Sequence, residues 1–205
     1  INKYCNISLK RTPSSCDFKH KISYSKTEVV NLISEINHPV VKRVMEDFSK
    51  DFKNQGYEIQ YTSELPTNSG VGSLSAFTVG IINLFCKELG IEKNKKELAN
   101  YAIKLLQNIY GEQIASQDQI ATTFGGFNQI NFKKGRQYDV ERIKIDYDRL
   151  NLLNSHLLLF YSGLDTFELV TSEQGDLQNT YETEKLKFNE KIMDRALNTL
   201  QNKNT

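Results

Sequence analysis

Apolar residues recur along the N-terminal half of the chain with the spacing of strands. Residues 1–10 alternate, with Cys5, Ile7 and Leu9 on one face, as in a half-buried strand. A second short strand is predicted at 21–25, where it would form a hairpin with the first. A third is predicted at 57–61, which is rich in aromatic and β-branched residues.

Helical spacing, with apolar residues three to four positions apart, predicts three helices in the same half. The first begins after Asn37 as N-cap, continues to Phe52 and is ended by Gly56. The second is apolar, follows the polar stretch 63–75 and ends near Leu89. The third covers 95–110 and has one apolar face.

The C-terminal half has a weaker pattern. Strands are predicted at 127–132 and 142–145, a buried central strand at 157–161, and a charged helix from about residue 182. The strands come in pairs beside helices, without regular alternation of strand and helix. The fold class predicted is therefore α+β, with an antiparallel or mixed sheet.

The stretch between the third strand and the apolar helix is a candidate anion site. Gly70 and Gly72 let the backbone approach a ligand closely, and the first turn of the following helix has unpaired N–H groups that bind phosphate well. Ser73 and Ser75 add hydroxyl groups. The alternative is a loop that only turns the chain and caps the helix.

Two common phosphate loops are excluded here. No Lys follows these glycines, as the P-loop pattern GxxxxGK[ST] requires. Ser75 stands at the third position of a GxGxxG or GxGxxA dinucleotide fingerprint, and Ala76 is one residue late.

The segment resembles the nucleotide-binding motif of the GHMP kinases, Pro-x-x-x-Gly-Leu-Gly-Ser-Ser-x-Ala. The corresponding residues here are Pro66-Thr-Asn-Ser-Gly70-Val71-Gly72-Ser73-Leu74-Ser75-Ala76. The likeness is strongest to the sugar-kinase branch typified by D-glycero-D-manno-heptose 7-phosphate kinase. It extends in family order through 22-ISYSKTE-28, 75-SAFTVG-80, 116-SQDQIATTFGGFNQINF-132 and 157-LLLFYSG-163.

The resemblance implies a fold and a reaction. The fold would be a GHMP-kinase N-terminal domain, similar to domain 2 of ribosomal protein S5, over residues 1–150. Residues 151–205 would begin an incomplete C-terminal domain, and the first and last family motifs would be missing. The activity would be transfer of the γ-phosphate of ATP, with Mg²⁺, to the anomeric hydroxyl of a heptose 7-phosphate.

The resemblance also implies site residues. The nucleotide phosphates would be held by Pro66, Ser69, Gly70, Val71, Gly72, Ser73 and Ser75. Asp118 would lie beside the phosphate-accepting hydroxyl, where it could orient that hydroxyl or accept its proton; its alternative use is to cap a helix or turn. Substrate contacts would come from Gln117, Gln119, Glu112 and Lys26, although a solvated charge is the favoured alternative for Glu112 and Lys26.

The chain differs from the family pattern at the positions of the magnesium ligands. A motif serine that binds the metal in close relatives is replaced by Leu74, and the neighbourhood of an expected Glu is Leu106 and Gln107. No metal ligand is clear, although the hydroxyl of Ser73 or Ser75 could serve. A second hypothesis follows: a catalytically impaired nucleotide- or sugar-binding protein or partner subunit with the same fold.

Composition removes other classes of function. The 205 residues carry a formal net charge of only +1, which argues against a nucleic-acid partner. The longest apolar runs are far shorter than the ~20 residues of a membrane helix. Cys5, Cys16 and Cys86 form no CxxC pair and predict free thiols in a reducing, cytoplasmic compartment. A sugar phosphate and ATP are the expected partners, and a homodimer is an option.

Overall fold

The computed structural model describes residues 3–64, 70–111, 114–160 and 179–201, the last of these as backbone only at 179–187 and 201. The chain forms two compact units, Ile1–Gly126 and Phe127–Thr205. The predicted domain boundary at residue 150 stays a prediction.

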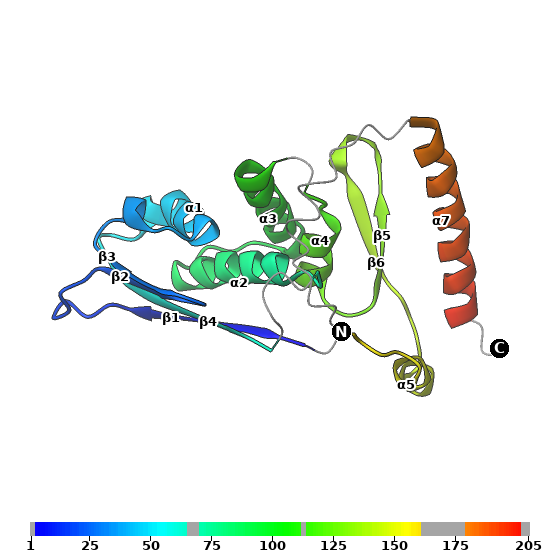
Figure 1. Cartoon of the computed structure of the whole chain (residues 1–205), viewed down its shortest axis with the longest axis horizontal. Helices are drawn as coiled ribbons and strands as arrows, with labels where there is room; N and C mark the ends of the chain where they lie inside the picture. The colour runs from blue at the N-terminus through cyan, green and yellow to red at the C-terminus, as the bar shows by residue number, and fades with distance from the viewer. Residues whose placement is uncertain (1–2, 65–69, 112–113, 161–178, 202–205) are drawn as a thin grey trace. The chain divides into compact units, whose positions relative to one another are not determined.

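The first unit is built on a four-stranded mixed sheet (Figure 1). Its strands are β1 (Cys5–Arg11), β2 (His20–Ser23), β3 (Thr27–Val30) and β4 (Tyr57–Ser63), in the order β1-β4-β2-β3. β4 pairs antiparallel with β1 and parallel with β2. The predicted hairpin of the first two strands is therefore wrong, because β4 lies between them and β2 forms its hairpin with β3.

Helices pack on one face of this sheet, where they enclose the core (Figure 1). They are α1 (Pro39–Phe48), α2 (Ser73–Glu88), α3 (Lys95–Tyr110) and α4 (Gln117–Phe124), with the short 3-10 helices η1 (Ile33–Glu35) and η2 (Ser49–Asp51). α2 is the central helix and contacts β1 and all three other α-helices. Residues Ile81, Ile82 and Phe85 of α2 are fully buried. The central position of α2 explains why this helix has apolar residues on more than one face. Cys86 is buried there too.

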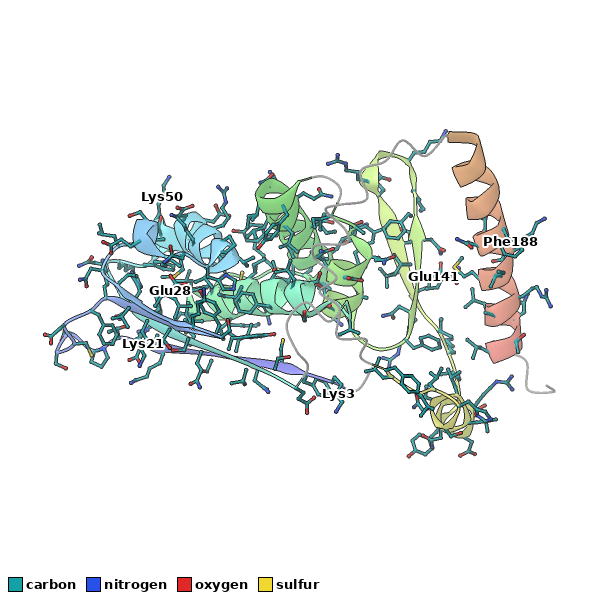
Figure 2. The ribbon with its side chains drawn as sticks, viewed as in Figure 1. Lys3, Lys21, Glu28, Lys50, Glu141 and Phe188 are labelled. Atoms are coloured by element: carbon teal, nitrogen blue, oxygen red, sulfur yellow. The ribbon has the colours of Figure 1, made fainter. Side chains whose placement is uncertain are left out.

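The start of α1 differs from the prediction. Its N-cap is His38, whose Nδ1 accepts a hydrogen bond from the N–H of Val41 at 3.4 Å. Asn37 instead donates its backbone N–H to the carboxylate of Glu28 on β3 at 2.6 Å (Figure 2 labels Glu28). Burial alone would raise the pKa of Glu28, but hydrogen bonds from Asn37, Tyr24 and His38 together lower it. An ionised Glu28 thus ties β3 to the beginning of α1.

Among its described residues the second unit contains a β-hairpin, a short 3-10 helix and two α-helices. Its elements are β5 (Asn128–Phe132), η3 (Lys134–Arg136), β6 (Tyr138–Arg142), α5 (Tyr147–Ser155) and α7 (Asn179–Gln201). β5 and β6 pair antiparallel. The strand predicted at 142–145 lies mostly beyond β6, since Arg142 is its last residue.

The buried strand predicted at 157–161 is wrong for the four of its residues that the structure describes. Residues 157–160 have no strand pairing, and Leu158 and Phe160 are 81% and 83% exposed. An apolar run alone does not distinguish a strand from an irregular segment. The α+β class itself, with a mixed sheet, is confirmed.

Candidate active site

The first turn of α2 is shaped as the sequence predicts for an anion site. Gly70 and Gly72 have φ of 73° and 79°, in the left-handed region that favours glycine. Gly72 is the N-cap, and its carbonyl accepts the N–H of Ala76 at 2.9 Å. Because glycine has no side chain with which to cap the helix, the N–H groups of the first turn remain available to a ligand.

Asp118 lies next to this loop. A Cβ placed on Gly72 would lie 3.6 Å from Oδ2 of Asp118, so loop backbone and carboxylate are neighbours although 46 positions separate them in the sequence. The N-cap of α4 is Ser116, so Asp118 is inside the first turn and is not the capping residue. Burial raises the pKa of its carboxyl group above the usual range.

Two of the residues predicted to bind ligands, Ser75 and Gln119, lie in the contact between α2 and α4. Ser75 and Gln119 are buried, at 5% and 1% exposure, and their side chains are 3.0 Å apart between α2 and α4. With the Gln119 amide turned so that its oxygen accepts from the Ser75 hydroxyl, its nitrogen donates to the carbonyls of Ala115 and Ser116. The pair joins the two helices and helps to hold Asp118 beside Gly72, and its contact with a ligand stays a prediction.

A pocket of about 700 Å³ opens beside the loop. It is lined by Val71, Gly72 and Ser73, by one side of α2, by the ends of β1 and β4, and by the end of α4 with Gly125 and Gly126. Two lysines, Lys3 and Lys87, lie on its wall (Figure 2 labels Lys3). A positively charged wall beside a helix N-terminus suits a phosphorylated ligand.

Sequence reasoning missed most of this wall. The pocket residues on α2 include Ala76, Gly80, Asn83 and Lys87, which recur every three or four positions. This stripe of small and polar residues on an otherwise apolar helix was the available signal. Lys3 could not be assigned in the same way, because it reaches the pocket only through the pairing of β1 with β4.

The other predicted residues differ in what the structure describes of them. Lys26 is exposed in the turn between β2 and β3 and does not line the pocket. Gln117 is exposed at the start of α4. Pro66, Ser69 and Glu112 lie outside the described residues.

The positions at which the family resemblance places metal ligands are used for packing. Leu74 packs against the core, Leu106 is fully buried, and the amide of Gln107 donates to the carbonyl of Ile114 at 3.4 Å. In the described parts of the chain no three His, Cys, Asp or Glu residues cluster as metal ligands. The oxygen donors beside the described part of the loop include the Ser73 hydroxyl and the Asp118 carboxylate, and Mg²⁺ would need phosphate and water for most of its ligands.

No helix among the described residues is both long enough and apolar enough to cross a bilayer.

Comparison with known proteins agrees with this geometry. Residues 39–126 match the family model of the GHMP kinases N terminal domain, a segment that contains both the loop and Asp118. The chain is 26% identical over 167 residues to D-glycero-alpha-D-manno-heptose 7-phosphate kinase of Campylobacter jejuni, covering 82% of this chain and 46% of that protein. It is 31% identical over 109 residues to mevalonate kinase of Pyrococcus furiosus, covering 53% and 30%.

A solved structure shows the same fold. The D-glycero-D-manno-heptose 1-phosphate kinase of Bacteroides thetaiotaomicron superposes with a TM-score of 0.65 at 22% identity, over 75% of this chain and 52% of that one. The chain thus spans about half the length of this protein and less than half of the two curated relatives. GHMP kinases are phosphotransferases that use ATP. The matched segment, the mixed sheet and the glycine loop at the start of α2 agree with one another, and residues 39–126 are similar to the N-terminal domain of the GHMP kinases.

Proposed function

We propose that this chain acts as an ATP-dependent sugar kinase, and that its acceptor is the anomeric hydroxyl of D-glycero-D-manno-heptose 7-phosphate. The observation that carries the proposal is the approach of Asp118 to the backbone of Gly72. Phosphoryl transfer needs a phosphate site and a group that handles the acceptor proton within a few ångströms of each other. The heptose acceptor is supported by the likeness to the Campylobacter jejuni enzyme.

In this proposal the start of α2 binds the nucleotide phosphates. The N–H groups of its first turn and the Ser73 hydroxyl donate hydrogen bonds, and the helix dipole favours their negative charge. The rest of the nucleotide occupies the adjoining pocket, whose volume of about 700 Å³ suits a ligand of that size. Lys3 and Lys87 supply positive charge.

Asp118 handles the acceptor. Its carboxylate accepts the proton of the sugar hydroxyl while the oxygen forms its bond to the γ-phosphorus and the bond to the β-phosphate oxygen breaks, which releases ADP. The raised pKa makes this carboxylate a better base than an exposed aspartate. Bound Mg²⁺ would neutralise the phosphate charge, with Ser73 and Asp118 as the oxygen ligands that the described chain offers.

The test is an ADP-release assay with a panel of sugars and sugar phosphates, on the wild type and on Asp118→Asn. Loss of a general base costs roughly 10²–10⁴-fold in turnover, so we expect a loss in that range. Asp148→Asn is the matched control, because Asp148 is exposed and occupies the equivalent second position of α5. Equal turnover of wild type and Asp118→Asn would refute the assigned role.

A second candidate function is a nucleotide- or sugar-binding protein that no longer catalyses. It is favoured by Leu74 and Leu106, which pack where the family resemblance places metal ligands. Thermal-shift titration separates the two functions, since a ligand stabilises the protein that binds it. Stabilisation by ATP that depends on Mg²⁺ supports the kinase, whereas stabilisation by sugar alone supports the binder.

A further inference from the structure

A second pocket of about 350 Å³ lies within the first unit and shares no lining residue with the larger one. It is enclosed by the beginning of β2, the segment after β3 with η1, and the chain around η2. Its lining residues are Lys19, His20, Asn31, Leu32, Ile33, Ser34, Ser49, Phe52, Asn54 and Gln55. None of these is acidic, and Lys19 gives the lining a positive charge at neutral pH.

Two residues of the pocket lining are buried, Phe52 and His20, and His20 is only 1% exposed. Its Nδ1 accepts the backbone N–H of Tyr57 at 3.3 Å, so the neutral ring has its proton on Nε2. Burial and the charge of Lys19 lower the pKa of His20 to about 4, which keeps the ring neutral at physiological pH. Over the described residues the Nε2–H group has no hydrogen-bond acceptor, and a buried donor without a partner is unfavourable.

Lys19 is held at this pocket by its surroundings. Its ammonium group donates to Oδ1 of Asn54 at 2.5 Å, and its backbone N–H donates to Oδ1 of Asn31 at 3.0 Å. Within the described ranges no carboxylate forms an ion pair with it. Asn54 is in the left-handed region, with φ of 68°, which Asn tolerates better than most residues.

The backbone at Lys19 is fixed as well. A Cβ on Gly56 would lie 2.0 Å from the carbonyl oxygen of Lys19, so only glycine permits this approach of the two chain segments. The donors of the pocket are thus positioned before any ligand binds, which lowers the entropic cost of binding. Leu32, Ile33 and Phe52 supply an apolar wall beside them.

We propose that this pocket is a second binding site, which takes a small oxyanion, a phosphoryl or carboxylate group, between the Lys19 ammonium and the Nε2–H of His20. An oxyanion supplies an acceptor for the Nε2–H of His20 and pairs with the positive charge of Lys19. The site does not depend on the kinase activity, because it shares no residue with the loop or with Asp118.

The test follows the histidine ring nitrogens by NMR in the whole chain, which contains only three histidines. Inorganic phosphate and malonate are titrated separately, with sodium chloride at matched ionic strength as a control. We expect a saturable change of the Nε2 resonance of His20 with at least one of the two anions, and none for His38 or His156. Phosphate at α2 would not produce this signal, since His20 does not line that pocket.

Variants give the test its specificity. Lys19→Gln removes the charge and is expected to weaken the anion roughly fivefold or more, whereas Lys104→Gln, an exposed lysine of α3, leaves it unchanged. Asn54→Gly keeps the left-handed backbone but removes the group that holds Lys19, and should also weaken binding. The proposal is overturned if neither anion saturates the signal, if chloride reproduces it, or if Lys19→Gln and Lys104→Gln bind alike.

Discussion

The substitution Gly72→Ala tests whether the approach of the loop to Asp118 matters for function. Gly72 has φ of 79°, and an L-residue in this left-handed region costs about 1–2 kcal/mol. The new methyl group would lie 3.6 Å from Asp118, which is an ordinary van der Waals distance and adds no clash. We therefore expect a modest loss of stability, seen as a fall in Tm of roughly 3–8 °C.

Gly90→Ala is the matched control for this experiment. Gly90 follows the end of α2 and has φ of 69°, and a methyl group added there would meet no atom of the described residues within 4 Å. Gly90→Ala should therefore lose the same stability of about 1–2 kcal/mol, from an L-residue in the left-handed region, without changing the candidate site. Comparing the two variants separates the effect on the site from the effect on stability.

Activity should separate the two variants. In Gly72→Ala the methyl group stands between the loop backbone and the carboxylate, where the proposed function places the transferred phosphate and the acceptor. Small displacements of reacting groups can cost as much as roughly 10²-fold in rate, so we expect at least about a tenfold lower kcat in an ADP-release assay below the Tm of both variants. Equal activity of the two variants would refute the reasoning.

Three further predictions concern stability. Burial raises the pKa of Asp118 in the folded protein, so between the unfolded-state and folded-state pKa values the folded protein binds more protons than the unfolded chain, and its stability falls as pH rises. Asp118→Asn should therefore have a higher Tm than wild type at pH 7. In a pH series of melting curves this difference in Tm should vanish below the unfolded-state pKa of about 3.9. Gln119→Leu leaves the buried Ser75 hydroxyl without its partner and should lower the free energy of unfolding by about 1–3 kcal/mol in urea titrations, while an unchanged midpoint would contradict the interhelical hydrogen bond. Gly56→Ala forces a methyl group to 2.0 Å from the carbonyl oxygen of Lys19 and should abolish cooperative unfolding monitored by circular dichroism. In the control Gly80→Ala, the methyl group meets only the end of the Ile7 side chain at 2.8 Å, and the free energy of unfolding should fall by about 1–3 kcal/mol.

Local signals in the sequence predicted α1, α2 and α3 and the strands β1, β2 and β4 of the first unit, whereas β3 and α4 were not predicted. The third helix is confirmed over the predicted residues, because Asn94 and Glu97 form a capping box at its start and Gly111 follows its end. The apolar helix and the strand before it are also confirmed as α2 and β4. These elements have strong patterns and local caps, which do not depend on the rest of the fold.

Long-range pairing could not be predicted in the same way. β4 inserts between β1 and β2 although more than thirty residues separate it from β2, and no local pattern records that insertion. Residues 157–160 have the composition of a buried strand but are exposed and without a strand partner in the described structure. An apolar sequence indicates that a segment tends to be buried, but it does not show which other element the segment packs against.

The candidate site also has parts that local sequence signals predicted and parts that depend on long-range packing. The loop at Gly72 and the acidic residue Asp118 were identified from motifs, and their proximity is a finding of the structure. Ser75 and Gln119 are buried, because the packing of α2 against α4 decides which face of each helix is covered, and their assignment to ligand binding stays a prediction. The pocket wall with Lys3 and Lys87 is assembled from separate elements and was missed.

The central claim is that nucleotide phosphates bind at the first turn of α2, beside Asp118. The direct measurement is a titration of the ¹⁵N-labelled chain with a non-hydrolysable ATP analogue and Mg²⁺, followed by the backbone amide resonances. The account predicts that the largest saturable changes occur at Gly72, Ser73 and Leu74, with smaller changes at Asn83 and Lys87 on the pocket wall. Saturable binding that leaves the amides of Gly72, Ser73 and Leu74 unchanged would contradict it.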